Sequence, residues 1–453
     1  MRYSFVFDQN RCTGCHACRL ACTIENGLAL DQSWRSIHTF NPRREPAAPV
    51  FHLSLACNHC AEPSCLAACP AQAYEKDAET GAVLVDDAKC IGCRYCIWAC
   101  PYDAPRFDST RGVITKCTFC VDRIRDGGQP ACAALCPTGA LRFERLTEQE
   151  ITNDAAGFPQ TDLEPAIRII PWWGGRGLAG GGADSGAGVT LIAPPSTSRI
   201  TLRSEWSLAL FTFLVSLLFG LVAAAAVGGR EVSPVLFLGI ALAGVSLSTM
   251  HLGKPLRAWR AALNVRTSWL SREIVSVGVF VAAGAAYLFL APRHGAAGWL
   301  TAAVGLIALI SVDMVYRVAE RPGVSIPHSG SALLTGLYLA GILSLNPALA
   351  GSAGLVQLVL YAWRKLQLTR AGVPARPTLS IARVVIGFGL PALAWVTAGE
   401  LPGWAIAAAL LGELIDRGEY YSGLEIRSPQ RQLAEDLAAW PASGSDTSSA
   451  AAA

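Results

Sequence analysis

Residues 89–107 read KCIGCRYCIWACPYDAPRF and hold four cysteines within eleven positions, with a proline directly after the fourth. The cysteines are Cys90, Cys93, Cys96 and Cys100, so the spacing is C-x2-C-x2-C-x3-C-P. Three thiolates on such a tight loop can bind three irons of one cubane, while the fourth is turned away and reaches a neighbouring cubane. The spacing therefore predicts a [4Fe–4S] cluster and a partner motif elsewhere in the chain.

Three further quartets supply partner motifs, and together the four motifs use all sixteen cysteines of the 453-residue chain. The quartets are Cys12, Cys15, Cys18 and Cys22, with Thr23 in place of the proline; Cys57, Cys60, Cys65 and Cys69, with a four-residue gap; and Cys117, Cys120, Cys132 and Cys136, with an eleven-residue gap. Zinc is the competing ligand for paired C-x2-C sequences, but it takes four ligands from two separated pairs. Spacing alone leaves open which motif exchanges its fourth cysteine with which.

Composition divides the chain near residue 205. All cysteines precede residue 137, whereas most of the long, nearly uncharged stretches follow residue 205. The formal charge of +3 gives no support to a nucleic-acid-binding function. The N-terminal sequence MRYSFVFDQNRC has no apolar core long enough for a signal peptide. We therefore expect thiols that stay reduced in the cytosol, where metal binding is more common than disulfide formation.

Four regions are expected along the chain. They are an α+β ferredoxin-like poly-[4Fe–4S] domain at residues 1–150, a Gly/Pro-rich linker at 151–204, an all-α eight-helix transmembrane bundle at 205–425, and a disordered tail at 426–453. Eight apolar spans of roughly 17 to 22 residues, long enough to cross hydrocarbon, begin near Trp206, Pro234, Ile274, Gly298, Ser331, Gly354, Ile381 and Gly403. The stretch LALFTFLVSLLFGLVAAAAV has no polar face, which argues against a soluble helical bundle.

Lysine and arginine residues indicate the orientation of the spans. Seventeen of them, between Arg199 and Arg431, fall on the side that holds the N-terminus, and only Arg230 and Arg293 fall on the other. Because positively charged loops remain in the cytoplasm, this bias predicts a multi-pass protein of the inner membrane with a cytoplasmic cysteine domain.

Residues 1–145 resemble the four-cluster iron–sulfur subunit of the dimethyl sulfoxide reductase family of molybdoenzymes, through their four cysteine motifs. In that family the first and last motifs pair, as do the two middle ones. The resemblance implies four ligand sets: Cys12, Cys15, Cys18 and Cys136; Cys117, Cys120, Cys132 and Cys22; Cys57, Cys60, Cys65 and Cys100; Cys90, Cys93, Cys96 and Cys69.

The membrane half resembles the eight-helix anchor subunit of the same family. HLGKPLRAWRAALNVRTSWLSREI (251–274) is similar to the loop after that subunit's second helix, and GELIDRGEYYSGL (412–424) is similar to its final helix. The resemblance implies that His251 and Glu273 exchange protons with quinone, whose reduction consumes two protons. Histidine titrates near neutrality, and a carboxylate at the membrane boundary can do so. The alternative for His251 is a polar residue at a helix end that faces lipid headgroups.

The membrane half offers few other candidates. Its three histidines, His251, His294 and His328, lie at span ends or in loops, so no haem is expected. Two oppositely charged pairs spaced four residues apart are expected to form ion pairs. They are Glu413 with Arg417 and Asp313 with Arg317.

These features predict an electron-transfer and membrane-anchor subunit that has no substrate-converting site of its own. Its expected partners are a molybdopterin-containing catalytic subunit and the quinone pool. The inward orientation is similar to that of membrane-bound sulfite-oxidising complexes, which favours electron flow toward quinone. The alternative is quinol oxidation for a dimethyl sulfoxide-type terminal reductase. An ion transporter with an iron–sulfur sensor domain would need several ionisable groups at mid-membrane, and a redox sensor would need only one cluster.

Overall fold

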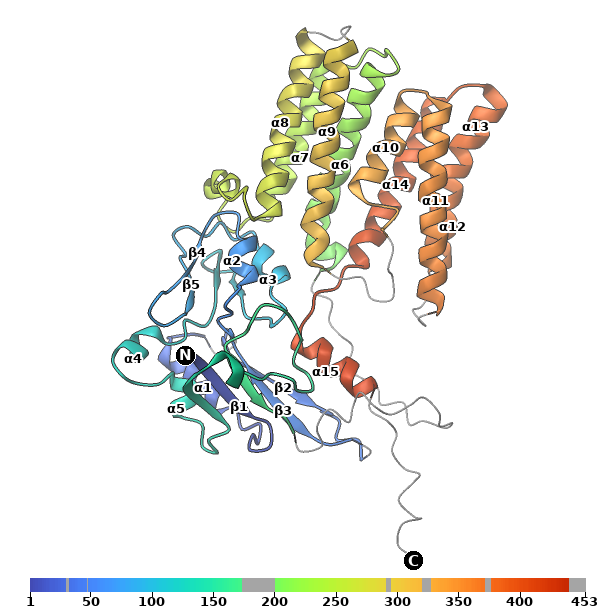
Figure 1. The fold of residues 1–453 in the computed structure, drawn as a ribbon. Coiled ribbons are helices and arrows are strands. Elements are labelled where there is room, and N and C mark those ends of the chain that lie inside the picture. The colour runs from blue at the N-terminus through green and yellow to red at the C-terminus, as the bar shows by residue number, and fades with distance from the viewer. Residues whose placement is uncertain are drawn as a thin grey trace, which may run out of the picture. The chain divides into compact units, whose positions relative to one another are not determined.

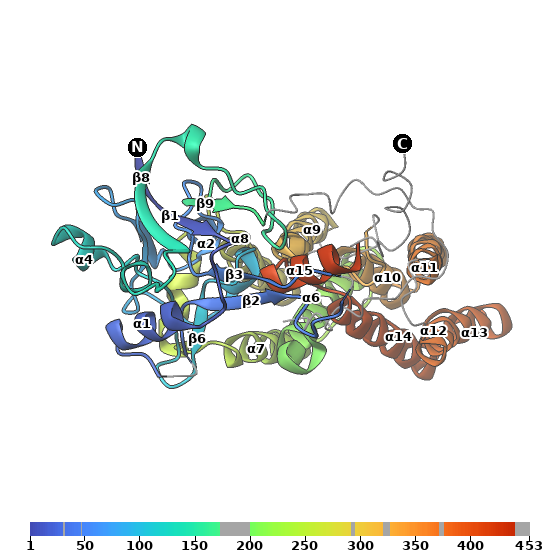
Figure 2. The ribbon, with the colours of Figure 1, turned by 90° about the horizontal axis from the view of Figure 1, so that it is seen from below.

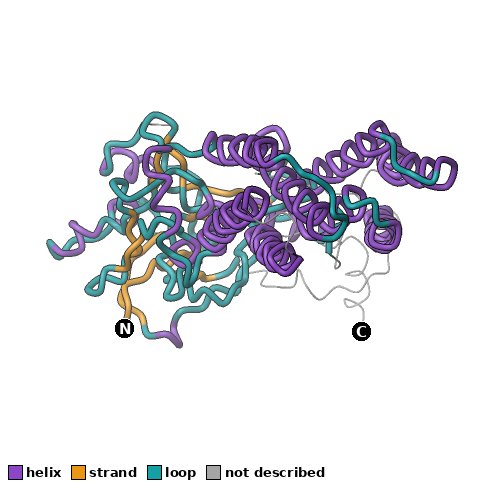
Figure 3. Tube along the Cα trace, turned by 90° about the horizontal axis from the view of Figure 1, so that it is seen from above, coloured by secondary structure: helices purple, strands orange, loops and turns teal. Residues whose placement is uncertain are grey.

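The computed structural model of the chain describes residues 1–29, 32–46, 48–172, 200–290, 295–319, 327–370 and 376–439 (Figure 1). The chain divides into two compact units. The cysteine unit comprises Met1–Thr197 and Arg427–Ala453, and the helical unit comprises Ser198–Ile426. Among the described residues, all strands lie in the cysteine unit, and the helical unit consists of helices and their connections (Figure 3).

A three-stranded sheet of order β8–β1–β9 supports the cysteine unit. Its strands are β1 (Arg2–Asp8), β8 (Leu141–Leu146), which is antiparallel to β1, and β9 (Ile167–Ile170), which is parallel to β1. The register places Phe5 opposite Phe143. Phe119 packs edge-on against both rings at centroid distances of 5.3 and 5.0 Å. This aromatic core joins the fourth cysteine motif to the sheet.

Three antiparallel hairpins and several short helices carry the rest of the unit. The hairpins are β2 (Ser36–Phe40) with β3 (Phe51–Leu55), β4 (Tyr74–Lys76) with β5 (Val83–Val85), and β6 (Arg106–Asp108) with β7 (Val113–Thr115). The helices are α1 (Ala17–Glu25), α2 (Ser64–Ala68), α3 (Tyr95–Ala99), α4 (Val121–Arg125), α5 (Ala131–Ala134) and the 3-10 turn η1 (Glu148–Glu150).

Two elements lie in segments expected to be irregular. Strand β9 falls within the expected linker, because IRII can pair with the edge of β1 and bury two of its side chains. Helix α15 (Pro429–Ala438) falls within the expected disordered tail. Its Leu433 and Leu437 pack on Phe40 and Phe51, so the tertiary contact orders a segment whose composition alone favours disorder. The glycine-rich stretch 174–188 and residues 440–453 lie outside the described residues.

The helical unit is formed by long helices that run alongside one another (Figures 1 and 2). They are α6 (Leu202–Ala226), α7 (Pro234–Met250), η3 (Pro255–Ala262), α8 (Trp269–Leu290), α9 (Gly295–Val315), η4 (Tyr316–Val318), α10 (Ala332–Leu343), α11 (Pro347–Arg370), α12 (Pro377–Val384), the π-turn η5 (Val385–Gly389), α13 (Leu390–Ala398) and α14 (Gly403–Ser422). Helix α6 packs against α7, α9, α10 and α14, which places it at the centre of the unit.

Helices occupy all eight positions where spans were expected. Judged by length and composition, however, fewer than eight of them could cross a membrane. Within the described ranges, four helices are long and apolar enough to cross a membrane, or five if α7 and η3, which meet at 103°, form one span. Helix α10 has twelve residues, about 18 Å of helix, which is less than the hydrocarbon thickness. Helix α14 carries several charged residues along its second half. The eight-span arrangement is therefore not confirmed.

Candidate functional site

The four cysteine motifs share one backbone geometry despite their different gaps. The residue before the second cysteine has a positive φ in every motif: 69° at Gly14, 43° at His59, 70° at Gly92 and 66° at Phe119. This conformation turns the loop back on itself, and it is inexpensive only for glycine. The third cysteine is the second residue of a short helix in every motif. The longer gaps are therefore accommodated before the third cysteine, and α4 occupies the longest one.

Backbone amides of these loops point toward the thiols. The N–H groups of Gly92 and Phe119 donate to Sγ of Cys90 and Cys117 at 3.4 Å, from the equivalent position in two motifs. The N–H of Leu141 donates to Sγ of Cys136 at 3.4 Å. Such bonds stabilise a thiolate more than a thiol, because an anionic acceptor strengthens them.

Cysteines from different motifs lie beside one another. The strongest electrostatic neighbours of the Cys12 thiol are Cys18, Cys136 and Cys15, so the fourth cysteine of the last motif joins the first motif. The neighbours of Cys22 are Cys132 and Cys120.

The two middle motifs cross in the same way. Cys60 lies near Cys57, Cys100 and Cys65, and Cys93 lies near Cys69 and Cys90. These neighbours follow the grouping that the resemblance implied, and the assignment of all sixteen cysteines to four clusters stays a prediction. Among the described residues, no three His, Cys, Asp or Glu side chains are close enough to share a single metal ion. A cubane takes one thiolate at each iron, so its ligands stand further apart than the ligands of one ion.

Burial acts on the protonation of these thiols. Desolvation raises the pKa of Cys22 to about 12, with Arg35 opposing it, and the pKa of Cys100 to about 11. Without iron these thiols keep their protons at pH 7, so cluster binding must displace them.

The second motif contains buried donors that suit a sulfur-rich group. His59 is 2% exposed and stacks on Phe119 with centroids 4.1 Å apart. Burial, with the charges of Lys116 and Arg35, holds the pKa of His59 well below its ordinary value, so its ring is neutral. Its Nδ1 accepts the N–H of Val83 at 2.9 Å, which leaves the proton on Nε2. That Nε2 is buried without a hydrogen-bond partner, as is Nδ2 of Asn58. Donors left unpaired beside Cys57 and Cys60 fit a cluster with acceptor sulfurs.

Two buried cations lie among the cysteine groups, and sequence reasoning missed both. Arg35 is 1% exposed, and its strongest favourable neighbours are Cys132, Cys18 and Cys117. Lys116 is 2% exposed. Burial alone would lower the pKa of Lys116, but the nearby cysteines raise it above its ordinary value. No local signal marks either residue, because burial is decided by distant segments.

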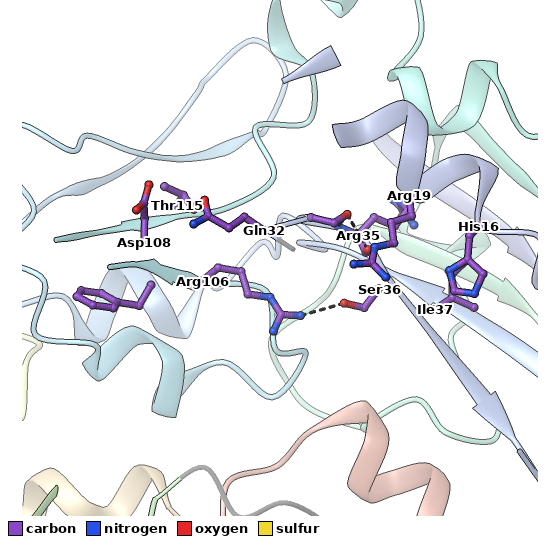
Figure 4. A pocket seen from close by; sticks show the side chains of 11 residues that line it. His16, Arg19, Gln32, Arg35, Ser36, Ile37, Arg106, Asp108 and Thr115 are labelled. Carbon is purple, nitrogen blue, oxygen red and sulfur yellow. Dashed lines mark hydrogen bonds between the residues drawn. The ribbon is translucent and has the colours of Figure 1, made fainter. Parts of the chain in front are cut away.

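A cavity of about 360 Å³ lies against the first motif (Figure 4). Its lining includes His16 and three arginines, Arg19, Arg35 and Arg106. Nη1 of Arg35 donates to Oγ of Ser54 at 3.1 Å, and that hydroxyl contacts Sγ of Cys18 at 3.4 Å. Arg35, which lines this basic cavity, thus reaches the thiol of Cys18 in the first motif through the hydroxyl of Ser54.

The two candidates for quinone chemistry lie on helices that pack together, α7 and α8. His251 is the half-buried C-terminal cap of α7, at the sharp bend before η3. Glu273 is 4% exposed in the second turn of α8. Its electrostatic neighbours are Asp313 of α9 and Tyr316 of η4. His328 is buried just before α10 and packs against the ring of Tyr420, while His294 lies outside the described residues.

Helices α10, α11, α12 and α14 enclose a network of charged side chains. Glu413 binds Nη2 of Arg383 at 2.5 Å, and both side chains are fully buried. Glu413 therefore pairs with a residue of α12 and not with Arg417, which corrects the expectation from spacing. Asp313 accepts the N–H groups of Ala332 and Leu333 at 2.6 and 3.0 Å, so this carboxylate caps the N-terminus of α10.

Comparisons with known proteins match both units. The description "4Fe-4S dicluster domain" matches residues 49–146, and "DMSO reductase anchor subunit" matches residues 201–351. The iron–sulfur subunit of the anaerobic dimethyl sulfoxide reductase of Haemophilus influenzae is 39% identical over 184 residues, covering 38% of this chain and 89% of the relative. The chain belongs to the dimethyl sulfoxide reductase family. Its order of domains is that of the family's iron–sulfur subunit fused to an anchor subunit.

Other members of the family are similar over the same region. The corresponding iron–sulfur subunit of Escherichia coli is 41% identical over 155 residues, covering 32% of this chain and 75% of the relative. A sulfite dehydrogenase subunit of Allochromatium vinosum is 35% identical over 198 residues, covering 38% of this chain and 78% of the relative. The cysteine unit is therefore an iron–sulfur electron-transfer domain, and the helical unit is a multi-pass membrane anchor.

Proposed function

We propose that this chain is the electron-transfer and membrane-anchor subunit of a molybdopterin oxidoreductase complex, linking a catalytic partner to the quinone pool. When bound, [4Fe–4S] clusters supply one-electron transfer. The chain's sixteen cysteines would hold four of them in the ligand sets named above. The observation that carries the proposal is the crossing of motifs, with Cys136 beside Cys12 and Cys22 beside Cys132. Crossed ligands tie successive clusters into one connected domain.

The crossing can be tested by exchanging one cysteine. Cys22→Ser in the full-length, iron-loaded protein should expose Cys117, Cys120 and Cys132 to alkylation, although they lie about a hundred residues away in the sequence. Cys12, Cys15 and Cys18, from the same motif as Cys22, should stay protected. Mass spectrometry of the alkylated peptides reads the result. Labelling of the first motif with protection of the last would reject the assigned ligand sets.

For the membrane unit we propose eight spans, with the iron–sulfur domain in the cytoplasm and quinone near the second and third helices. His251 and Glu273 would exchange protons with the quinone oxygens. Glu273 near the start of α8 and Asp313 near the end of α9 are electrostatic neighbours, which places two carboxyl groups together at the ends of packed helices and supports this role. The seventeen-to-two distribution of basic residues supports the orientation.

We further propose that electrons flow from a sulfite-like substrate to quinone. The cytoplasmic orientation and the similarity to a sulfite dehydrogenase subunit support this direction. The alternative is quinol oxidation for a terminal reductase, since relatives include subunits of tetrathionate and thiosulfate reductases. Membranes with the co-purified molybdenum partner should reduce quinone with sulfite as donor. Quinol oxidation with dimethyl sulfoxide, without sulfite activity, would support the reverse direction.

A second candidate function, ion transport, is favoured by one observation. Arg383, Glu413, Asp416 and Arg364 are buried among helices of the membrane unit, and ionisable groups in such places often serve ion or proton paths. Proteoliposomes with an internal pH indicator test this function. Proton uptake under an imposed potential without any quinone would support ion transport. An internal pH that stays constant under the same potential would reject it.

A further inference from the structure

The ammonium group of Lys116 lies near two of the cysteine groups and is held by two hydrogen bonds to backbone carbonyls. Nζ donates to the carbonyl oxygens of Cys117, at 2.9 Å, and of Val83 in β5. Its electrostatic neighbours are Cys57 and Cys65, which belong to one group, and Cys117, which belongs to another. With 2% of its surface exposed, the side chain cannot turn out into solvent without opening the core.

A fixed positive charge in this position must change the reduction potentials of the clusters near it. A cubane with four thiolate ligands is anionic, and accepting an electron adds one more negative charge. A nearby positive charge stabilises the reduced form more than the oxidised form, and the effect is large where water is excluded. Because Lys116 neighbours cysteines of two groups, its charge acts on both at once.

The chain contains its own comparison for this residue. Lys89 and Lys116 each come directly before the first cysteine of a motif, Cys90 and Cys117. The side chain of Lys89 is 45% exposed and pairs with Asp86 at 3.2 Å. Water and a counter-charge screen Lys89, so only Lys116 should influence a cluster strongly.

We propose that Lys116 is a positioning residue that raises the reduction potentials of the two clusters near it. These clusters are the one assigned to Cys22, Cys117, Cys120 and Cys132 and the one assigned to Cys57, Cys60, Cys65 and Cys100. The proposal rests on the ligand sets of the proposed function. Arg35 adds a second buried cation near the first of these clusters, through Cys132, Cys117 and Cys22, and it also neighbours Cys18 of the cluster assigned to the first motif. By contrast, burial is the largest influence on the Cys96 thiol, followed by Cys93 and Tyr74.

Redox titration of the full-length, iron-loaded protein, followed by electron paramagnetic resonance, tests the proposal. Lys116→Gln keeps an N–H donor but removes the charge, and Lys89→Gln is the matched control. In Lys116→Gln two cluster signals should move to lower potential while the other two stay in place. In Lys89→Gln all four should keep wild-type potentials. A fully loaded Lys116→Gln protein with four unchanged potentials would overturn the proposal, as would an equal shift in Lys89→Gln.

Two further measurements separate the possible failures. Iron analysis of the wild-type protein tests the proposed function itself, because a chain without iron–sulfur clusters fails before Lys116 matters. If Lys116→Gln does not load iron, the order of the cluster reduction potentials in the wild-type protein tests the proposal instead. The two clusters beside Lys116 should be reduced at higher potential than the cluster assigned to Cys69, Cys90, Cys93 and Cys96, whose signal is identified by Cys90→Ser. The reverse order would overturn the proposal.

Discussion

Removing Arg383 should destabilise the membrane unit strongly, because its partner would remain as a buried charge. Nη2 of Arg383 lies 2.5 Å from Oε1 of Glu413, and neither side chain is exposed. The guanidinium also packs over the ring of Phe388 at 4.2 Å. Arg383→Met keeps the apolar stem in this space and removes only the charged group.

The expected size follows from the surroundings of Glu413. Breaking a buried pair by removing one partner costs about 3–5 kcal/mol. Thr335 and Gln357 still donate hydrogen bonds to Oε2 of Glu413, at 2.8 and 3.1 Å, so we expect a loss near the lower limit of about 3 kcal/mol. The double variant Arg383→Met/Glu413→Gln should recover most of this loss, because residue 413 is then uncharged and Asp416, which loses Arg383 at 3.6 Å, keeps Arg364 at 3.6 Å.

The matched control lies at the exposed end of the same network. Lys365 pairs with Glu419 at 2.7 Å, but its side chain is 26% exposed, so Lys365→Met should cost at most about 1 kcal/mol. Denaturant unfolding of the detergent-solubilised full-length protein, followed by tryptophan fluorescence, measures all variants. If Arg383→Met loses no more stability than Lys365→Met, or if the double variant is no better than the single one, the reasoning about the buried pair is refuted.

Two other predictions concern the cluster loops and the quinone site. Gly14→Ala and Gly27→Ala both place alanine at positive φ, which costs about 1–2 kcal/mol. At Gly14 the new Cβ would also lie 2.6 Å from the His52 ring, whereas Gly27 faces open space. In metal analysis, Gly14→Ala should therefore lose about four irons, one cubane, while Gly27→Ala keeps the wild-type iron content. Equal iron contents in the two variants would contradict this. His251→Ala should abolish quinone turnover while all cluster signals remain, and unchanged turnover would remove His251 from the site.

Local spacing was enough to predict the metal-binding half. A cysteine motif is a continuous loop, so the residues that turn it and those that bind iron are neighbours in the sequence. Long apolar stretches likewise indicated helices at each expected position, since hydropathy is a property of consecutive residues and does not depend on tertiary contacts.

Burial and partner choice depended on the tertiary structure. Lys89 and Lys116 occupy equivalent places in the sequence, yet only Lys116 is covered, because β5 closes over it. Spacing paired Glu413 with Arg417, but α12 brings Arg383 closer, and a buried carboxylate binds the cation that packing presents. Helix α15 formed in an expected disordered tail because Phe40 and Phe51 offered its leucines a surface. Short-range spacing and hydropathy were thus sufficient to predict which groups carry the chemistry. Which charges are excluded from water, and which groups they contact, depends on the folded arrangement, because those contacts join segments far apart in the chain.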